Sequence, residues 1–261
     1  MYRPVRNESV EILYRVEGQG EPLVLLHGFT DNSEAWRDYG FNHPLLAAGR
    51  RLIMIDARGH GRSARPHEAA AYAPHARAAD VIAVLDALRL PRADVLGYSM
   101  GGWTAYCVAQ YFPERVRSII AGGTQPYGQS LEPYRRILAC GLDCWADIVE
   151  EMADRPVPRR RLLANDIAAL QAVVAEDRPN IASAVARTRL PMLLYAGGAD
   201  PIHDLIRRFG READAEFLSL PERNHIQALL AAEIVVPRVV AFLERLDRAD
   251  AEARAARRLA S

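Results

Sequence analysis

The residues best suited to chemistry in this chain form the motif Gly-Tyr-Ser-Met-Gly at positions 97–101. The motif follows an apolar run over 93–98 and precedes a helix-like segment, so it predicts a sharp turn from strand to helix. Glycine leaves room two residues to either side of Ser99, and the turn raises the serine hydroxyl above the sheet. It also directs the backbone N–H of Met100 towards the position of an oxyanion. Because glycine and serine are common in ordinary turns, the motif needs support from elsewhere in the chain.

A serine hydroxyl becomes a nucleophile only beside a general base, which in turn needs an acid to orient it. The chain supplies both downstream, in the order serine, aspartate, histidine. Asp200 follows the apolar run 191–197, and Pro201 after it fits a turn that directs the carboxylate inward. His225 lies in the loop between the last predicted strand and the last predicted helix. Asp204 is the alternative acid, and a helix N-cap is the alternative role of Asp200.

The other histidines are interpreted as structural or surface residues. His27 precedes a glycine where a strand ends, and we expect it to shape that turn. The backbone N–H of Phe29, beside the same glycine, is the predicted second donor of an oxyanion hole. His60 lies in the glycine-rich turn 56–63, and the rest are in polar or surface positions: His43, His67, His75 and His203.

The composition excludes several classes of function. Basic and acidic residues number 33 each, so no overall field favours nucleic acid or an anionic membrane. The sequence contains no lysine, which excludes a Schiff base or a P-loop. Because neither a signal-peptide core nor a membrane-spanning run is found, we expect a cytoplasmic protein. Its partner is expected to be a small-molecule substrate, without nucleic acid or membrane, and a homo-oligomer is left open.

The cysteines indicate a reducing compartment. Cys107, Cys140 and Cys144 are an odd number in a long chain, which argues against a disulfide framework. Two thiols without a nearby histidine do not make a zinc site, so we expect buried structural thiols at 140 and 144. We expect neither a metal nor an organic cofactor.

The order of the predicted elements indicates an α/β fold, with a mostly parallel sheet flanked by helices. Strands are predicted at 10–16 (an edge strand), 23–26, 51–55, 93–98, 116–121, 191–197 and 216–220, and core helices at 74–88, 101–111, 202–211 and 227–246. In such sheets ligands bind at the carboxyl ends of the strands, where Phe29, Ser99 and Asp200 are predicted to lie.

The segment 124–188 contains no predicted strand, and helices are predicted around 131–153 and 160–175. We interpret it as a helical cap inserted between the two parts of the core, 1–123 and 189–261. The Ala/Arg-rich end from 250 onwards has no apolar face, so it either frays or extends as an exposed helix.

These motifs together resemble the α/β-hydrolase superfamily over roughly residues 10–247. The matching motifs are His27-Gly28-Phe29, the turn 56–63, the run 97–102, Gly198-Ala199-Asp200-Pro201 and Asn224-His225. The resemblance implies an oxyanion loop, a structural turn, a nucleophile elbow, an acid and a base at these positions, in that order. It implies that Ser99 attacks a carbonyl, that His225 transfers the proton, and that water then releases the acid. Serine at position 99 argues against haloalkane dehalogenases and epoxide hydrolases, which have aspartate there.

We therefore expect a serine hydrolase that cleaves a small carboxylic ester or lactone through an acyl-enzyme on Ser99. Hydrolases of carbon–carbon bonds in ring-fission products share the small cap and often the Ser-Met-Gly-Gly elbow. They usually have Gly-His-Trp around the base, where this chain has Asn224-His225-Ile226. Two further alternatives stay open, because a fold does not fix a substrate. One is a cofactor-free perhydrolase, and the other is a non-catalytic receptor for a small ligand.

Aromatic and basic side chains supply candidates for contacts with the substrate. The aromatic candidates for an apolar acyl pocket under the cap are Trp36, Trp103, Tyr127, Tyr134 and Trp145, with core packing as the alternative. The basic runs 135–136 and 159–161 are candidates for holding a substrate carboxylate, with a solvated helix face as the alternative.

Overall fold

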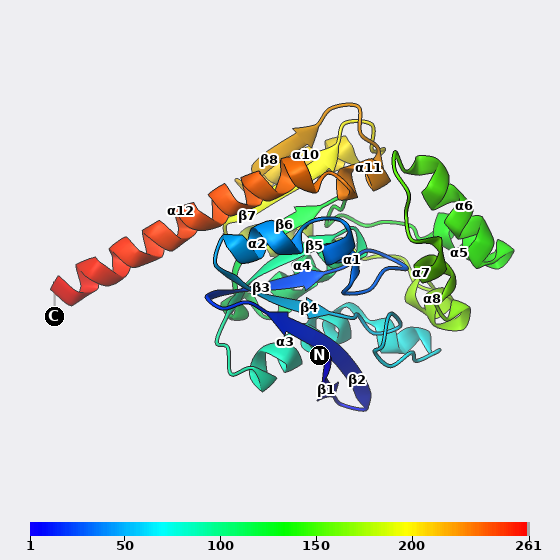
Figure 1. The fold of residues 1–261 in the computed structure, drawn as a ribbon, viewed down its shortest axis with the longest axis horizontal. Coiled ribbons are helices and arrows are strands. Elements are labelled where there is room, and N and C mark those ends of the chain that lie inside the picture. Colours follow the sequence, from blue (N-terminus) through cyan, green and yellow to red (C-terminus); the bar gives the residue numbers. More distant parts are fainter. Residues whose placement is uncertain (260–261) are drawn as a thin grey trace.

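Eight strands form a single sheet in the order β1-β2-β4-β3-β5-β6-β7-β8 in the computed structural model, which describes residues 1–259 (Figure 1). The strands are β1 Arg3–Asn7, β2 Val10–Glu17, β3 Glu21–Leu26, β4 Arg50–Ile55, β5 Ala93–Tyr98, β6 Val116–Gly122, β7 Met192–Gly197 and β8 Glu216–Leu220. β1 and β2 pair antiparallel, β2 also pairs antiparallel with β4, and the remaining pairs are parallel. The predicted α/β fold is therefore confirmed.

The prediction of an edge strand at 10–16 was wrong, because β1 forms that edge and β2 is the second strand. β1 is largely exposed, and only Val5 of its apolar side chains packs against the core. Its sequence Arg-Pro-Val-Arg-Asn therefore lacks the alternation of apolar and polar residues that marks a strand.

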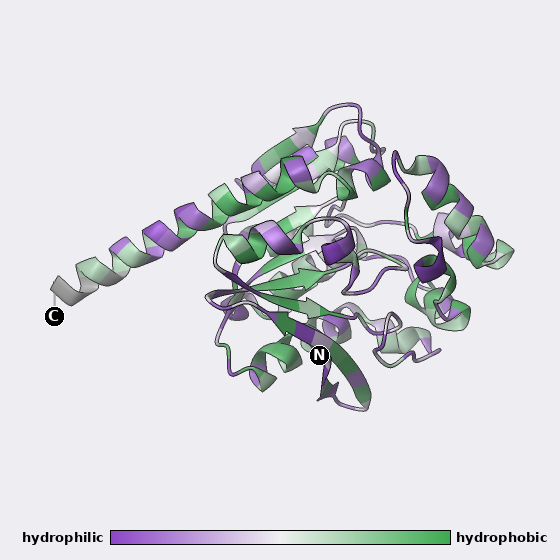
Figure 2. Cartoon of the chain, in the orientation of Figure 1, coloured by the Kyte–Doolittle hydropathy of each residue, from purple (hydrophilic) through white to green (hydrophobic). Residues whose placement is uncertain are grey.

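Helices cover both faces of the sheet. The helices are α1 Ala35–Asp38, α2 Asn42–Ala47, α3 Pro74–Ala87, α4 Met100–Tyr111, α5 Glu132–Cys140, α6 Leu142–Met152, α7 Arg159–Leu163, α8 Ile167–Val173, α9 Ala182–Arg187, α10 His203–Glu212, α11 His225–Leu229 and α12 Ala232–Leu259, with short 3₁₀ helices at Ala69–Tyr72 and Pro113–Arg115. Alternate residues of β3 face opposite layers. Val24 belongs to the hydrophobic cluster that contains residues of α3, α4 and α10, whereas Leu23 belongs to the cluster that contains residues of α1, α2 and α12. Figure 2 shows the resulting hydrophobic colouring of the central strands.

The last predicted helix, 227–246, is in fact two helices, α11 and α12. The first half of α12 packs on the sheet through Val235, Val239 and Phe242. Beyond this contact the helix projects from the body (Figure 1), and it is still helical at residues 250–259. As far as residue 259 the Ala/Arg-rich end thus extends as a helix, exposed at 251–253 and 255–256, which was one of the two expected outcomes.

Between β6 and β7 the chain forms α5 to α9. One isolated β-bridge in this segment joins Gln129 to Arg178, outside the main sheet. Figure 1 shows α5 to α8 beyond the carboxyl ends of the parallel strands. In contrast, α9 packs against the core through Ala182 and Val185. The division into core and cap at residues 124–188 stays a prediction.

The prediction of reduced, buried thiols at Cys140 and Cys144 was wrong. The two residues form a disulfide with their Cα atoms 6.0 Å apart, and Cys140 is exposed. They do not share one helix, because the chain turns at Gly141 (φ 114°) between α5 and α6. Cys107 is a buried free thiol, and burial raises its pKa to about 12.

Candidate active site

Ser99 occupies the turn between β5 and α4 with a φ of 53°, in the left-handed region that non-glycine residues seldom adopt. A Cβ on Gly101 would lie 1.9 Å from the carbonyl oxygen of Leu26, and a Cβ on Gly97 would lie 2.3 Å from that of Gly101. Both glycines are therefore required by close backbone contact. The N–H of Ser99 donates to the carbonyl of Gly122 on β6 at 2.8 Å, which holds the strained turn against the sheet.

Asp200 and His225 are in direct contact, since 2.7 Å separates the Oδ2 of the aspartate from the Nδ1 of the histidine. Asp200 lies between β7 and α10, is only 5% exposed, and accepts a second hydrogen bond from the N–H of Ile202 at 3.1 Å. Burial by itself raises the pKa of Asp200, but the hydrogen bond and charge of His225 outweigh it, so the pKa is lowered. An ionised Asp200 keeps the proton on Nδ1 and leaves Nε2 of His225 as the acceptor.

Two contacts fix the position of His225 at the start of α11. Asn224 caps this helix through a reciprocal pair of hydrogen bonds with Gln227. The hydroxyl of Tyr98 donates to the carbonyl of His225 at 2.5 Å, and the two rings are 5.2 Å apart. Burial raises the pKa of Tyr98, so its phenol stays a neutral donor. Tyr98 is not among the predicted site residues, because nothing local indicates a contact 127 positions along the chain.

Ser99 and His225 line the same two cavities, one of about 370 Å³ and one of about 60 Å³. Within residues 1–259 the structure shows no hydrogen bond between these two side chains. Hydrogen bonds of this kind are often long without substrate and tighten in the complex. The structure thus joins the predicted acid and base directly, and it brings the predicted nucleophile to the walls of the same cavities.

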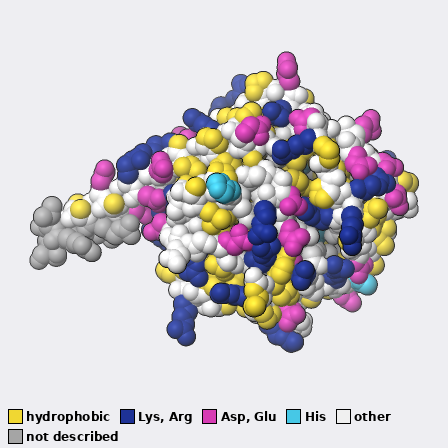
Figure 3. Space-filling model, in the orientation of Figure 1, with side chains coloured by type: hydrophobic (Ala, Val, Ile, Leu, Met, Phe, Trp, Pro, Cys, Tyr) yellow, Lys and Arg dark blue, Asp and Glu magenta, His cyan; other side chains and the backbone are white. Residues whose placement is uncertain are grey.

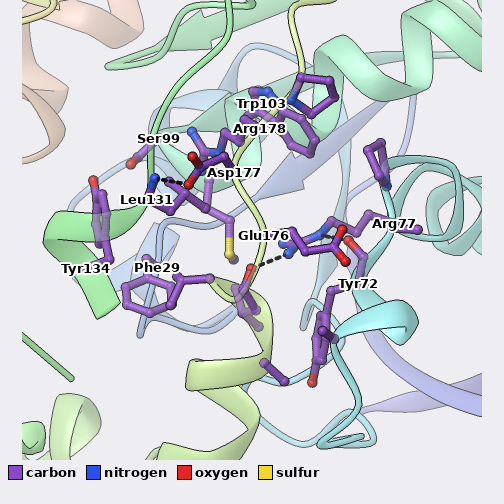
Figure 4. Close-up of a pocket in the computed structure, with 18 residues that line it drawn as sticks. Phe29, Tyr72, Arg77, Ser99, Trp103, Leu131, Tyr134, Glu176, Asp177 and Arg178 are labelled. Atoms are coloured by element: carbon purple, nitrogen blue, oxygen red, sulfur yellow. Dashed lines mark hydrogen bonds between the residues drawn. The ribbon is translucent and has the colours of Figure 1, made fainter. Parts of the chain in front are cut away.

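The predicted oxyanion donors, Phe29 and Met100, both line a third cavity together with Ser99 (Figure 4). In the described part of the chain neither backbone N–H has a hydrogen-bond acceptor. The loop that carries Phe29 is fixed by His27, whose Nε2 accepts from the N–H of Ala57 at 3.0 Å. The Nδ1 of His27 therefore carries the proton and donates to the carbonyl of Gly28 at 2.8 Å.

The loop beyond Phe29 is also held from the side of the predicted cap. The indole N–H of Trp145 donates to Oγ1 of Thr30 at 2.8 Å, and Nδ2 of Asn165 donates to the Thr30 carbonyl at 2.8 Å. Arg161 forms an ion pair with the buried Asp31 at 3.2 Å. The oxyanion loop and the helical segment above it are therefore mechanically connected.

We expect Arg161→Met to lower the free energy of unfolding by about 3 kcal/mol at pH 7, because it leaves the buried Asp31 without its cation. Burial already raises the pKa of Asp31 above its ordinary value, in spite of the charge of Arg161. A raised pKa means that the folded state favours the protonated acid. The stability of the variant should therefore recover partly as the pH falls and Asp31 binds a proton.

Urea unfolding of Arg161→Met at pH 7 and at pH 4.5 measures both effects. The matched control is Arg136→Met, because Arg136 is 78% exposed and its one ion pair within residues 1–259 is with Glu132 on its own helix. Equal losses for the two variants, or a loss from Arg161→Met that does not change with pH, would contradict the assignment.

The aromatic candidates fall into two groups. Trp103, Tyr134 and Trp145 line cavities that also contain Ser99. Trp36 was wrongly predicted as a pocket residue: it is 1% exposed and packs in the core against Phe41, with the ring centroids 5.0 Å apart. Tyr127 is also away from the described cavities and packs edge-on against Phe209. Aromatic residues in core and pocket look alike in a sequence, so spacing could not separate these cases.

Four of the five arginines of the two predicted basic runs are engaged in ion pairs, and Arg160 is the exception within the described chain. Arg135 and Arg136 pair with Glu132, Arg159 pairs with three acidic residues of α6, and Arg161 pairs with Asp31. Two other arginines, Arg77 and Arg178, line the cavity beside Ser99 (Figure 4) and were not predicted. Across residues 1–259 no three His, Cys, Asp or Glu side chains are grouped to bind a metal, and no helix has the length and apolarity to cross a membrane.

Comparisons with known proteins agree with the fold. The family model of the alpha/beta hydrolase fold matches residues 21–139, which include Ser99 but end before Asp200. The dihydrolipoyllysine-residue acetyltransferase component of the acetoin cleaving system from Pseudomonas putida is 34% identical over 246 residues, which are 87% of this chain and 64% of that protein. The 2-hydroxy-6-oxo-2,4-heptadienoate hydrolase from Pseudomonas putida is 33% identical over 65% of this chain and 60% of that protein.

The matches therefore span less than two thirds of the length of these curated relatives. Among solved structures, a thermophilic esterase from Thermogutta terrifontis superimposes with a TM-score of 0.80 at 22% identity. This match covers 94% of this chain and 99% of the esterase. At this identity the similarity shows a shared fold.

Proposed function

The chain belongs to the α/β-hydrolase superfamily, and on this premise we propose that it is a serine hydrolase of small carboxylic esters or lactones. One observation carries the proposal: the hydrogen bond between Asp200 and His225 at the wall of cavities that Ser99 also lines. A strained serine, an oriented imidazole and a buried carboxylate are the parts that acyl transfer needs. The binding partner is then a small molecule.

In the proposed reaction, Nε2 of His225 accepts the proton of the Ser99 hydroxyl while Oγ of Ser99 attacks the carbonyl carbon of the substrate. The N–H groups of Phe29 and Met100 stabilise the resulting oxyanion. His225 then returns the proton to the departing alcohol oxygen, which leaves an acyl group on Ser99. Water, deprotonated by His225, attacks this ester, and the carboxylic acid is released as Ser99 regains its proton.

A second candidate function uses the same residues. A relative named 2-hydroxy-6-oxo-2,4-heptadienoate hydrolase is similar over 65% of this chain, which favours hydrolysis of a carbon–carbon bond as the alternative. In that case the bond cleaved beside the attacked carbonyl joins two carbons, and the proton goes to carbon. The Asn224-His225-Ile226 sequence, which differs from the Gly-His-Trp usual in such enzymes, is the reason to place this candidate second.

A substrate panel tests the proposal: 4-nitrophenyl esters, five- and six-membered lactones, and a vinylogous diketo acid. We expect turnover of an ester or lactone, a burst of product that approaches one equivalent of enzyme, and an acyl group on Ser99 in the mass spectrum of the quenched enzyme. Cleavage of the diketo acid alone would favour the second candidate. An inert protein, or an acyl group on another residue, would contradict the proposal.

A further inference from the structure

Ser99 lies where three described cavities meet, and these cavities differ in chemistry. The cavity of about 370 Å³ below α5 and α6 is mainly apolar, with Ile137, Ile148 and Met152 in its wall. The cavity of about 60 Å³ beside Trp145 is mainly apolar too. The third, of about 260 Å³, is lined by the guanidinium side chains of Arg77 from α3 and Arg178 from the loop before α9. Figure 4 shows Arg178 drawn between Ser99 and Trp103, with Arg77 on the side away from Ser99.

Both arginines are half-buried, and neither has an acidic partner among residues 1–259. The four arginines whose side chains are the least exposed of the ion-paired ones each contact a carboxylate: Arg50 with Asp247, Arg58 with Asp80, Arg117 with Asp94, and Arg161 with Asp31. No carboxylate oxygen among residues 1–259 lies within 4.0 Å of Arg77 or Arg178. Figure 3 shows acidic and basic side chains interspersed over the visible surface, so carboxylates are not scarce in this protein.

The charges on the two arginines act on each other. Burial, and after it the positive charge of Arg178, lowers the pKa of Arg77 to about 10. Burial also lowers the pKa of Arg178. Holding two cations together without a counter-ion costs free energy, and such unfavourable arrangements are concentrated at functional sites.

Neutral groups hold both side chains in place. Arg178 exchanges two backbone hydrogen bonds with Gln129, and its Nη1 donates to Oε1 of Gln129 at 2.9 Å. Its guanidinium carbon lies 5.2 Å from the ring centroid of Trp103. Arg77 donates to the backbone carbonyls of Tyr72 and Val173, at 2.8 Å each. Nε and Nη2 of Arg178 and Nη1 of Arg77 have no acceptor among the described residues, so both side chains keep free donors.

Two carboxylates, Glu176 and Asp177, also line this cavity, and both are exposed. Asp177 already accepts hydrogen bonds from the N–H of Leu131 at 2.8 Å and from Arg135 at 2.9 Å. Glu176 forms no ion pair within the described chain. Neither carboxylate therefore forms an ion pair with Arg77 or Arg178.

We propose that Arg77 and Arg178 form a subsite for a carboxylate of the substrate, in the cavity of about 260 Å³ that Ser99 also lines. The proposal rests on the proposed function and narrows it to esters or lactones that carry a negative charge. The reacting carbonyl lies at Ser99, the carboxylate lies between the two guanidinium groups, and an apolar part fits below α5 and α6. Arginine suits this role because its planar group can donate two parallel hydrogen bonds to a carboxylate.

Matched ester pairs test the subsite: 4-nitrophenyl hydrogen succinate, glutarate and adipate against the butyrate, valerate and hexanoate esters of equal acyl length. We expect kcat/KM to be higher for at least one acidic ester than for its neutral counterpart. Arg178→Gln should lower kcat/KM for that ester by about 10–100-fold, because it removes a hydrogen bond to a charged group. The neutral ester should change by less than about 3-fold, since it makes no such bond.

Arg77→Gln should act in the same direction, and Arg178→Lys should restore part of the selectivity because it keeps the charge. The matched control is Arg136→Gln, which removes an exposed arginine outside the cavity and should change neither ester. Equal losses of kcat/KM on acidic and neutral esters, or no preference for an acidic ester at any length, would overturn the subsite. If hydrolysis still depended on Ser99, the proposed function would stand.

A binding measurement tests the subsite even if the protein hydrolyses no ester or lactone, and so separates it from the proposed function. Calorimetric titration of glutarate into Ser99→Ala needs no turnover, and we expect binding that Ser99→Ala/Arg178→Gln loses by at least about 10-fold. If no ester or lactone is hydrolysed but this difference is measured, the subsite stands and the proposed chemistry fails. If glutarate binds equally to both variants, or to neither, the subsite is overturned.

Discussion

Ser99→Ala should lower kcat for the best ester by about 10⁵–10⁶-fold, because it removes the atom that forms the acyl-enzyme. The burst of product should disappear with it. The substitution keeps the Cβ and adds no volume, so the turn at φ 53° should survive and the thermal unfolding temperature should stay within a few degrees. Slow residual hydrolysis above the rate in water should persist, since the oxyanion donors and the cavities are unchanged.

Ser9→Ala is the control for this experiment, because Ser9 is an exposed serine in the turn between β1 and β2. It should leave kcat within about 2-fold of the parent value, as surface substitutions usually do little. A Ser99→Ala enzyme that retains activity within about 10-fold would show that the nucleophile lies elsewhere and would end the serine-hydrolase proposal.

Most of the sheet could be predicted from the sequence because its central strands are buried on both faces. β5 and β8 begin and end at the predicted residues, since both are bounded by turns. β1, α1 and α2 were missed because they are short and show no clear periodicity. The start of α11 was missed although the Asn224 and Gln227 of its capping box stand at the expected spacing, so that signal was available.

Some residues of the site could be predicted from local sequence motifs, whereas others depend on contacts between distant parts of the chain. The turn at Ser99 follows from a five-residue motif, because glycines at 97 and 101 are needed by neighbouring backbone atoms. Asp200 and His225 could be proposed from their order and their places after strands. The contact of Tyr98 with His225 and the placement of Arg77 and Arg178 in one cavity depend on tertiary packing, which leaves no mark on local sequence. Local excess of charge was misleading, since Arg159 is neutralised by acids on α6.

Asp200→Asn should lower kcat by about 10⁴-fold while leaving the fold unchanged, because an amide reverses the polarity of the contact with Nδ1 of His225. The amide NH₂ donates where the carboxylate accepts, so Nδ1 becomes the unprotonated nitrogen and Nε2 carries the proton. A histidine in that tautomer cannot accept the proton of Ser99. KM should change much less than kcat, since the carboxylate lies behind the histidine.

The pH dependence of stability gives an independent measurement on the same variant. The pKa of Asp200 is lower in the folded than in the unfolded protein. The ionised carboxylate therefore stabilises the fold at any pH above the unfolded pKa, and this contribution is lost as the pH falls through the folded pKa. Asp200→Asn should therefore lose less stability than the parent between pH 5 and pH 3.

Asp204→Asn is the decisive control, because Asp204 is the alternative acid and its side chain is 93% exposed beside His203. We expect it to change kcat by less than about 2-fold, as exposed substitutions usually do. If Asp204→Asn were the more damaging change, the acid would have been assigned wrongly, and the short contact between Asp200 and His225 would be structural. If neither change mattered, His225 would act as the base without a carboxylate to orient it, and the assignment of an acid would fail.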